Sequence, residues 1–494
     1  MPSMNKIALK NTLHHIGMSL IIVVLVAGVL AKIGLRFSMV DPAMQHWNDE
    51  LDYFQMTASV AKYGHPLGYF GYNESRAQYG GFGSWNPLIM FFYAPFYLLQ
   101  NGSTLSIYHA NLFLMCLAMF IFFQWNHCSW KECLLYSVPL LAGQIVRYSY
   151  SGLSEAMYWF LTILIICCII HRENPRIYRL GLFLTAYASI TRMYMLIYLL
   201  PLMFSEGTSR KRCIQFIILS VSVLLISSTM DRFFSAAYIR PSLRTDELKN
   251  ALLEGPASAF SFIAANFYEM TDFIRNGIGY GERRAVLYLI CCITAVFLVI
   301  RSIVRYIRHQ MTLHDRMLNL VYFAGFLVMI NTYYIGETDR HLFILAMFIW
   351  FLLIHEDIME QNRPMFAAVL AIVLIGTDAV FFRNSENVWL YDEENLYHMP
   401  ELTELDPDGE DLYDNTIAYE FDTDFNSFRS LYDVQPGMGI SFCQSSYLMD
   451  LPQIRSKYVF LSGKSECLDI YDSSSDWEKF AENEKCVLFV RKDS

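Results

Sequence analysis

Long apolar runs alternate with shorter polar segments over the first 383 residues of the chain. A helix needs about 20 apolar residues to cross a bilayer, and fewer where it is broken or re-entrant. The pattern therefore predicts a mainly α fold, a polytopic transmembrane helical bundle of about 9–11 membrane segments, some of them re-entrant. The candidate segments are residues 15–35, 87–100, 105–125, 133–148, 153–170, 180–204, 213–234, 285–300, 317–335, 341–355 and 364–382.

Two of these segments depart from a simple crossing helix. Residues 87–100 are short, begin at Pro87 and precede uncharged residues, which favours a re-entrant or interfacial piece. Residues 180–204 join two basic loops that must share one side of the membrane, which predicts two half-helices meeting near Thr191 and Arg192. Non-helical backbone at this depth is tolerated only against protein or a wet cavity. The break is therefore expected to line a site.

The basic segments predict the orientation of the chain in the membrane. Cytoplasmic loops carry an excess of Lys and Arg, so we place the N-terminus and residues 171–179, 206–212 and 301–316 in the cytoplasm. No small-residue cleavage site follows the first apolar run, which indicates an uncleaved first helix. The segments predicted to face outward are residues 36–86, 148–154, 235–284 and 336–340 and the C-terminal tail.

The second large outer loop, residues 235–284, has a periodicity of its own. Apolar residues recur at helical spacing around Leu252, Phe260 and Phe267. This spacing is typical of an amphipathic helix that lies on a membrane surface.

The tail differs sharply in charge from the rest of the chain. Residues 384–494 hold 24 acids and 8 bases, whereas residues 1–383 hold 23 acids and 29 bases. Strand-like runs near residues 458 and 486 alternate with a helical-looking stretch, residues 476–484. We therefore predict a transmembrane domain over 1–383 and a small, acidic, extracytoplasmic α/β domain over 384–494.

Composition supports a membrane protein and narrows its partners. Hydrophobic residues make up 54% of the chain and charged residues only 17%, where ordinary soluble proteins have about 25% charged residues. The net charge of −10 argues against a nucleic-acid partner, because nucleic acids are themselves negatively charged. Most of the 11 cysteines lie in apolar runs, at most one pair in the tail could be oxidised, and no metal-ligand spacing is present.

The richest cluster of candidate chemistry follows the first apolar run, between residues 41 and 87. Asp49, Glu50 and Asp52 lie within four positions, ahead of a Tyr- and Gly-rich stretch. Carboxylates are poor membrane anchors. An alternative interpretation is the solvated first turn of a helix, which acids suit. We expect position 52 to turn away from position 49.

Ionisable residues inside apolar runs are expensive in lipid and usually face a cavity or a partner. Arg192 sits at the predicted helix break, where it could hold an anion or, alternatively, reach the membrane interface. Glu155 follows the turn at residues 151–154 and begins a helix, with Ser154 as its expected N-cap. Arg147 lies close enough in the sequence to pair with Glu155.

A second ionisable cluster lies between two apolar runs, at residues 333–341. Glu337 fits an ordinary solvated loop, whereas Arg340 and His341 open the next apolar run. We expect these two basic residues at the outer headgroup level, where they would meet a lipid phosphate.

Five sequence blocks resemble the GT-C membrane glycosyltransferases, which include protein mannosyltransferases and aminoarabinose transferases. They occur in order over about 380 residues and leave out the tail. The blocks read WNDELDYFQMTASVAKYG, SWNPLIMFFYAP, SGLSEAMYWFLTIL, ASITRMYMLIYLLP and GETDRHLFILAMF.

The resemblance implies transfer of a sugar from a polyprenyl-phosphate donor on the outer face of the cell membrane. By position in the motif, Asp49 is the implied general base and Glu50 its orienting partner. Arg192, Arg340 and His341 are nominated to hold the lipid phosphate, and inverting family members use direct displacement. The acceptor would be an envelope glycan, a lipid or a protein, and the family's variable metal use leaves a divalent cation open. The extra acid Asp52 departs from the family pattern.

Two other classes of function fit part of the pattern. A transporter or lipid flippase would also use broken helices and intramembrane charge, but such proteins tend to show internal repeats, and none is evident here. A non-catalytic membrane scaffold that presents the acidic tail is the third class. Loss of glycan without loss of expression, on substitution of Asp49 and Glu50, distinguishes an enzyme from a scaffold.

Overall fold

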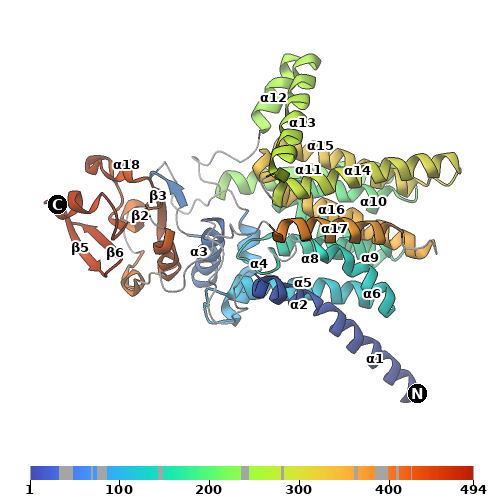
Figure 1. Cartoon of the computed structure of the whole chain (residues 1–494), viewed down its shortest axis with the longest axis horizontal. Helices are drawn as coiled ribbons and strands as arrows, with labels where there is room; N and C mark the ends of the chain where they lie inside the picture. Colours follow the sequence, from blue (N-terminus) through green and yellow to red (C-terminus); the bar gives the residue numbers. More distant parts are fainter. Residues whose placement is uncertain are drawn as a thin grey trace.

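The computed structural model describes residues 2–32, 48–67, 70–74, 86–142, 148–234, 244–279, 283–360, 365–383, 399–407, 411–423 and 425–492. A bundle of helices carries a mixed sheet at one end (Figure 1). The helices of the first 383 residues are α1 Pro2–Ser19, α2 Ile21–Lys32, α3 Asn48–Tyr63, α4 Pro87–Leu99, α5 Ser106–Trp125, α6 Trp130–Ser137, η1 Val138–Leu141, α8 Glu155–Ile170, α9 Pro175–Thr191, η2 Met193–Tyr198, α10 Leu199–Phe204, α11 Arg210–Phe234, α12 Thr245–Glu254, α13 Pro256–Gly279, α14 Arg283–Ile307, α15 Leu313–Thr332, α16 Ile335–Met359 and α17 Met365–Arg383.

The apolar helices form the multi-pass membrane bundle that the hydrophobic runs predict. Six helices within the described ranges are long and apolar enough to cross a bilayer: Lys10–Gly28, Ser106–Trp125, Arg210–Met230, Arg284–Ile307, Leu313–Thr332 and Thr338–Met359. Four shorter apolar helices lie among them: Leu88–Leu99, Glu155–Ile170, Met193–Phe204 and Met365–Gly376. The helix α16 is the most central, since its residues from Leu342 to Ile354 are almost fully buried.

The break predicted near Thr191 and Arg192 is present. The helix α9 ends at Thr191, Arg192 is extended with φ −140° and ψ 97°, and the 3-10 turn η2 then leads into α10. The prediction of one helix over residues 133–148 is wrong, because α6 ends at Ser137 and a 3-10 turn containing Pro139 follows it. A proline has no N–H with which to continue the helical ladder.

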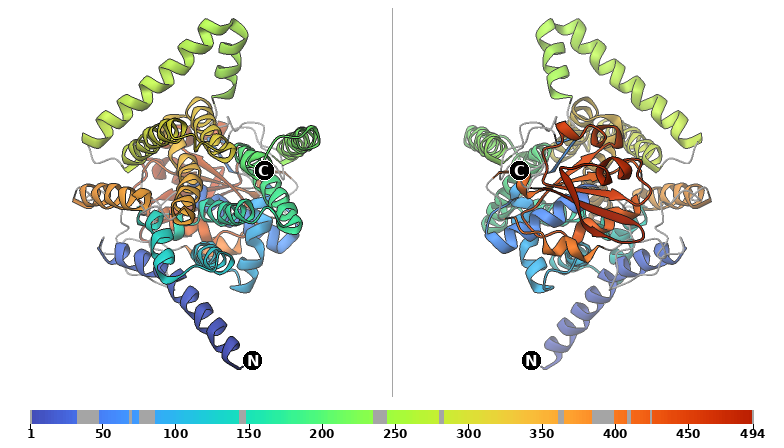
Figure 2. Two further views of the ribbon diagram at one scale, coloured as in Figure 1. Left: turned by 90° about the vertical axis from the view of Figure 1, so that its right-hand side faces the viewer. Right: turned by 90° about the vertical axis from the view of Figure 1, so that its left-hand side faces the viewer.

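Within the predicted second outer loop, residues 245–279 fold into two helices, α12 and α13, that project from the bundle (Figure 2). Their apolar side chains Leu253, Phe260 and Tyr268 are exposed, as expected for an amphipathic surface element. Arg244 anchors the base of α12, since its Nη1 donates to Asn266 Oδ1 at 2.7 Å and to Glu269 Oε2 at 2.8 Å.

The soluble part is built on a six-stranded sheet of order β1-β3-β2-β4-β6-β5. The four strands at one side pair in parallel, whereas β6 is antiparallel to both of its neighbours. Its strands and helices are β1 Phe70–Tyr72, η5 Pro400–Glu404, η6 Tyr413–Asn415, β2 Thr416–Glu420, η7 Phe425–Asp433, β3 Gly439–Cys443, α18 Ser445–Leu448, η8 Leu451–Gln453, β4 Tyr458–Ser462, α19 Leu468–Asp472, β5 Trp477–Glu482 and β6 Cys486–Arg491.

The segment that follows α3, predicted as the first outer loop, contributes an edge strand to this sheet. Strand β1 pairs with β3, with Phe70 opposite Ile440 and Tyr72 opposite Phe442. The buried Glu74 then accepts hydrogen bonds from the backbone N–H groups of Arg455 and Ser456, each at 2.7 Å. The loop that follows the acidic cluster is thus bound directly to the soluble part.

The helix predicted over residues 476–484 is wrong, because Trp477–Glu482 form strand β5. Glu, Lys and Ala are good helix formers, but helix propensity is a weak preference, and pairing along β6 outweighs it. A turn stabilises this hairpin, since Asn483 Oδ1 accepts hydrogen bonds from the backbone N–H groups of Lys485 and Cys486.

The helix α3 lies between the membrane bundle and the soluble part, and this position determines the site. Every residue from Glu50 to Val60 is buried. Gln55 Nε2 donates to the carbonyl oxygens of Leu431 and Val434, at 3.0 and 3.1 Å, in and just after η7. Phe54 packs against the ring of Tyr432, with centroids 5.3 Å apart.

Candidate functional site

The site begins at the first turn of α3, where two carboxylates have different partners. Asp49 Oδ2 accepts a hydrogen bond from Arg340 Nη1 at 3.1 Å. Glu50 is almost fully buried and accepts hydrogen bonds from the backbone N–H of Gly152 at 2.9 Å and the hydroxyl of Tyr108 at 3.1 Å. Glu50 is therefore held in a fixed orientation, whereas Asp49 faces a guanidinium.

Gly152 is required for the close approach to Glu50. A Cβ at position 152 would lie 2.9 Å from Glu50 Cβ and 3.3 Å from Glu50 Cγ. Any larger residue would therefore displace the carboxylate beside Asp49. The turn at 151–154 fixes this approach, because Asn111 Nδ2 donates to the carbonyl oxygens of Ser151 and Leu153.

A buried ion pair stands beside these carboxylates. Arg192 Nη2 lies 2.6 Å from Glu155 Oε1, and their side chains retain 9% and 1% of their exposure. The guanidinium stacks on the ring of Tyr158, 4.0 Å from its centroid. The break in α9–η2 therefore brings a positive charge to the start of α8, and Glu155 compensates that charge.

The helix α16 joins the two acids through Arg340. Its guanidinium contacts Asp49 and also lies 3.9 Å from Glu155, measured between Nε and Oε1. His341 Nδ1 lies 2.9 Å from Arg192 Nη1, and Tyr333 packs on the His341 ring with centroids 4.1 Å apart. Two acids, two arginines and a histidine from four segments thus form one connected cluster, here called the outer cluster.

The imidazole of His341 is not a second positive charge in this arrangement. A guanidinium nitrogen always donates, so the Nδ1 that receives the bond from Arg192 must carry a lone pair. His341 therefore orients Arg192. The predicted contact of His341 with a lipid phosphate stays a prediction.

Ser154 also has a role that the sequence did not predict. Its hydroxyl makes no capping bond to the backbone of α8. The oxygen instead accepts a hydrogen bond from Arg192 Nη2 at 3.2 Å and donates to Tyr53 OH at 2.9 Å. Ser154 therefore occupies the expected N-cap position of α8, but its side chain connects α3 to the arginine and does not cap the helix.

The two aspartates of α3 influence each other. Burial raises the pKa of the Asp49 carboxyl, and the Arg340 guanidinium lowers it in part. Burial and the charge of Asp49 together raise the pKa of Asp52 well above its usual range. The prediction that Asp52 points away from Asp49 is wrong, because residues three apart on a helix share a face.

Two predicted site residues cannot be placed in this cluster. Arg147 lies outside the described residues, and only the backbone of Glu337, within α16, is described. Tyr108, Gly152 and Ser154 were not predicted, because single Tyr, Gly and Ser residues carry no sequence signal. Within the described ranges, no three His, Cys, Asp or Glu side chains converge as a metal-binding group.

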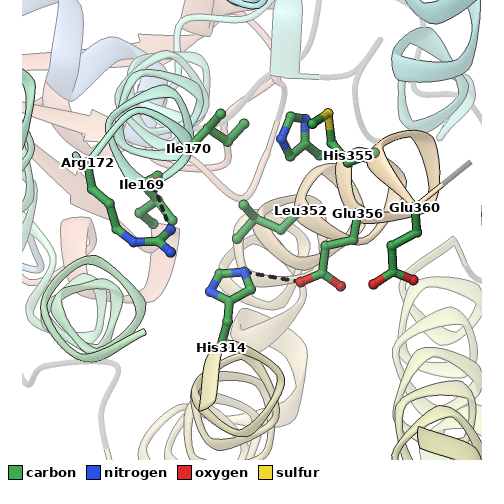
Figure 3. Close-up of a pocket in the computed structure, with 9 residues that line it drawn as sticks. Ile169, Ile170, Arg172, His314, Leu352, His355, Glu356 and Glu360 are labelled. Carbon is green, nitrogen blue, oxygen red and sulfur yellow. Dashed lines mark hydrogen bonds and ion pairs between the residues drawn. The ribbon is translucent and has the colours of Figure 1, made fainter. Parts of the chain in front are cut away.

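A second charged cluster lies at the opposite end of the bundle, near the C-terminus of α16. Arg301 bonds Asp315 at 2.9 Å and also Glu356, while Arg305 lies 3.3 Å from Asp315. Arg305 further bonds Glu360 at 2.6 Å, and His314 bonds Glu356 at 3.1 Å. These residues are here called the inner cluster, and three of them, His314, Glu356 and Glu360, line a cavity of about 230 Å³ (Figure 3).

Comparison with protein-family models and with curated protein sequences gives no match to this chain. Among solved structures, the archaeal oligosaccharyltransferase AglB from Archaeoglobus fulgidus, in complex with an inhibitory peptide and a dolichol-phosphate, is similar with a TM-score of 0.51. The two sequences are 11% identical, and the match covers 94% of this chain and 70% of that chain.

ArnT from Cupriavidus metallidurans in the apo state gives a TM-score of 0.42 at 10% identity, covering 94% of this chain and 97% of that chain. ArnT bound to undecaprenyl phosphate gives 0.40 at 11% identity with the same coverage. The similarity to AglB shows that this chain shares the fold of that oligosaccharyltransferase.

Proposed function

We propose that the protein is an integral-membrane glycosyltransferase that moves a sugar from a polyprenyl-phosphate donor to an extracytoplasmic acceptor. The observation that carries the proposal is the outer cluster, where Asp49, Arg340, Arg192 and Glu155 meet between the membrane helices and the soluble part. Fold similarity alone does not assign function. The cluster supplies the two groups that glycosyl transfer needs, a base and a cationic phosphate site.

The arginines are the proposed phosphate site. A leaving phosphate is stabilised by donors that are already oriented before the reaction, and a planar guanidinium suits phosphate oxygens. Arg192 is oriented by Tyr158 and His341, while Arg340 is shared between Asp49 and Glu155. A donor phosphate would compete with the carboxylates for these guanidinium groups.

Asp49 is the proposed general base, with Glu50 as its neighbour in a fixed position. The acceptor hydroxyl loses its proton to the Asp49 carboxylate as its oxygen attacks the anomeric carbon, and the bond from that carbon to the donor phosphate breaks. When the phosphate takes over Arg340, Asp49 loses its strongest cationic partner. A carboxylate that loses a cationic partner becomes a stronger base, so donor binding would prepare Asp49 for proton transfer.

Purified protein in lipid nanodiscs tests this proposal. Polyprenyl-phosphate sugars are supplied with envelope glycan, lipid or peptide acceptors, and release of the polyprenyl phosphate is followed. Acceptor-dependent release by the wild type, and its loss in Asp49→Asn, is the expected result. Equal release by the wild type and Asp49→Asn would overturn the assignment of the base, and no release with any donor would overturn the activity.

A further inference from the structure

Asp52 is the third acid of α3, and its surroundings differ from those of Asp49 and Glu50. It is 9% exposed, and among the described residues no donor reaches its Oδ1. One turn further along the same helix face, Gln55 is 3% exposed, and no described donor reaches its Oε1. Two buried acceptor oxygens at i and i+3 therefore lack a donor.

The orientation of the Gln55 amide is determined by its other contacts. Both hydrogens of Nε2 are used, because this nitrogen donates to the carbonyl oxygens of Leu431 and Val434. A flipped amide would place its oxygen against those two carbonyl oxygens. Gln55 Oε1 is therefore turned away from these two carbonyl oxygens, and Asp52 lies one turn before Gln55 on α3.

Buried acceptors are almost always paired with a donor, and an unpaired one costs about 1–3 kcal/mol. A single proton on Asp52 would satisfy both oxygens, because residues at i and i+3 are neighbours on a helix surface. We infer that Asp52 is protonated and donates a hydrogen bond to Gln55 Oε1, so that the pair positions α3 against η7. This inference rests on the proposed function only for its kinetic readout.

The charges around Asp52 favour this neutral form. From its own helix it faces Asp49, which burial and Arg340 leave as the acid that ionises first. From η7 it faces Tyr432, whose ring is in turn approached by Arg429 at 5.3 Å. Within the described ranges, no Lys, Arg or His forms a salt bridge with Asp52. Ionisation would thus place a second negative charge beside Asp49 without compensation.

The inference makes Asp52 a positioning residue that acts through Gln55, and not a second base. Asn at position 52 keeps an N–H donor for Gln55 Oε1, so Asp52→Asn should retain turnover to within about threefold of the wild type at neutral pH. Gln55→Glu keeps the size of the side chain but loses the two donors to η7, and should lower turnover at least tenfold. At alkaline pH the wild type should lose activity as Asp52 ionises, whereas Asp52→Asn should not.

An infrared spectrum of the purified protein gives a readout that needs no activity. The band of a protonated carboxyl group should be present in the wild type at neutral pH and lost in Asp52→Asn. Glu420→Gln is the matched control: Glu420 is a buried acid in the soluble part, remote from α3. This substitution should leave that band and the alkaline limb of activity unchanged.

The possible outcomes separate this inference from the proposed function. An unchanged infrared band in Asp52→Asn, or a loss of turnover as deep as that of Asp49→Asn, would overturn the protonated-carboxyl assignment. If the wild type transfers no sugar, the proposed function fails, and the infrared band still decides the protonation of Asp52.

Discussion

The two ends of α16 carry charged clusters of similar composition and different organisation. Arg340 and Glu356, which belong to the two clusters, are 16 positions apart on α16. At a rise of 1.5 Å per residue this is about 24 Å, which is close to the thickness of a bilayer core. In the inner cluster, Arg301 and Arg305 each bond two acids, and Asp315 also accepts the backbone N–H of Thr312 at 2.7 Å. The inner cluster connects α14, α15 and α16 into one compensated network.

The outer cluster is paired in a similar way. Arg340 contacts two acids, Asp49 and Glu155, and each cluster keeps one buried carboxylate oxygen that accepts no hydrogen bond from the described residues, Glu155 Oε2 and Asp315 Oδ1. Asp49 retains 22% of its side-chain exposure at the surface of the cluster. The two clusters differ in position, because the inner one joins three membrane helices, whereas the outer one lies at the break between α9 and η2 and includes α3. We therefore assign binding and catalysis to the outer cluster and stability to the inner one.

The largest effect is expected from Asp49→Asn. Asparagine keeps the shape of the side chain but cannot accept a proton, and general-base assistance is typically worth about 10²–10⁴ in rate. Turnover should fall by that factor, while binding of the polyprenyl-phosphate sugar, measured by equilibrium titration, should persist. Glu50→Gln should cost less, because Glu50 only orients. Normal turnover in Asp49→Asn together with no turnover in Glu50→Gln would assign the general base to Glu50.

Arg192→Ala should lower both stability and donor binding, because it leaves Glu155 buried without its partner. Breaking a buried ion pair typically costs about 3–5 kcal/mol. The double variant Arg192→Met with Glu155→Gln removes both charges and should recover much of the thermal stability in detergent. It should still fail to bind donor. Donor binding at the wild-type level in this double variant would exclude Arg192 from the phosphate site.

Gly152→Ala should reduce turnover by about 10-fold to 10²-fold, because misplacement of a catalytic group by about 1 Å has effects of this size. The added methyl group would push Glu50 away from the turn. Gly376→Ala is the matched control, since nothing lies within 4 Å of a Cβ built at that position in α17. Equal turnover of the two variants would show that the position of Glu50 is unimportant.

Arg301→Ala should act on stability alone. It removes one partner from Asp315 and Glu356 and leaves others in place, so we expect a loss of about 1–3 kcal/mol in unfolding free energy. Turnover per folded molecule, with folded protein counted by size-exclusion chromatography, should stay within about twofold of the wild type, because the substitution leaves every contact of the outer cluster in place. A specific loss of donor binding would contradict the division between the two clusters.

Much of the membrane bundle could be predicted, because long apolar runs directly indicate segments that are buried in lipid. The break at Arg192 followed from two basic loops that cannot lie on opposite sides of the membrane. Strand β1 and strand β5 were not predicted. Strand β1 is a three-residue Phe-Gly-Tyr run that depends on pairing with the distant β3, and the Glu-rich β5 depends on pairing with β6, which its composition does not indicate.

The sequence indicated which charged residues belong to the site, but not which of them contact one another. The acids and arginines stood out because charge is rare inside apolar sequence. Their pairing did not, since Arg340 meets Asp49 across 291 positions of the chain. Tyr108 and Gly152 were not predicted for the same reason, because their contacts with Glu50 arise only when segments distant in the sequence pack together.

Equilibrium binding of polyprenyl phosphate to two matched variants tests the central claim most directly. Arg340→Gln and Arg305→Gln each remove one charge from a paired cluster at opposite ends of the bundle, and both are prepared in nanodiscs. We predict that Arg340→Gln weakens binding at least tenfold and that Arg305→Gln binds like the wild type. Weakened binding in Arg305→Gln, with normal binding in Arg340→Gln, would contradict the assignment of the outer cluster as the phosphate site.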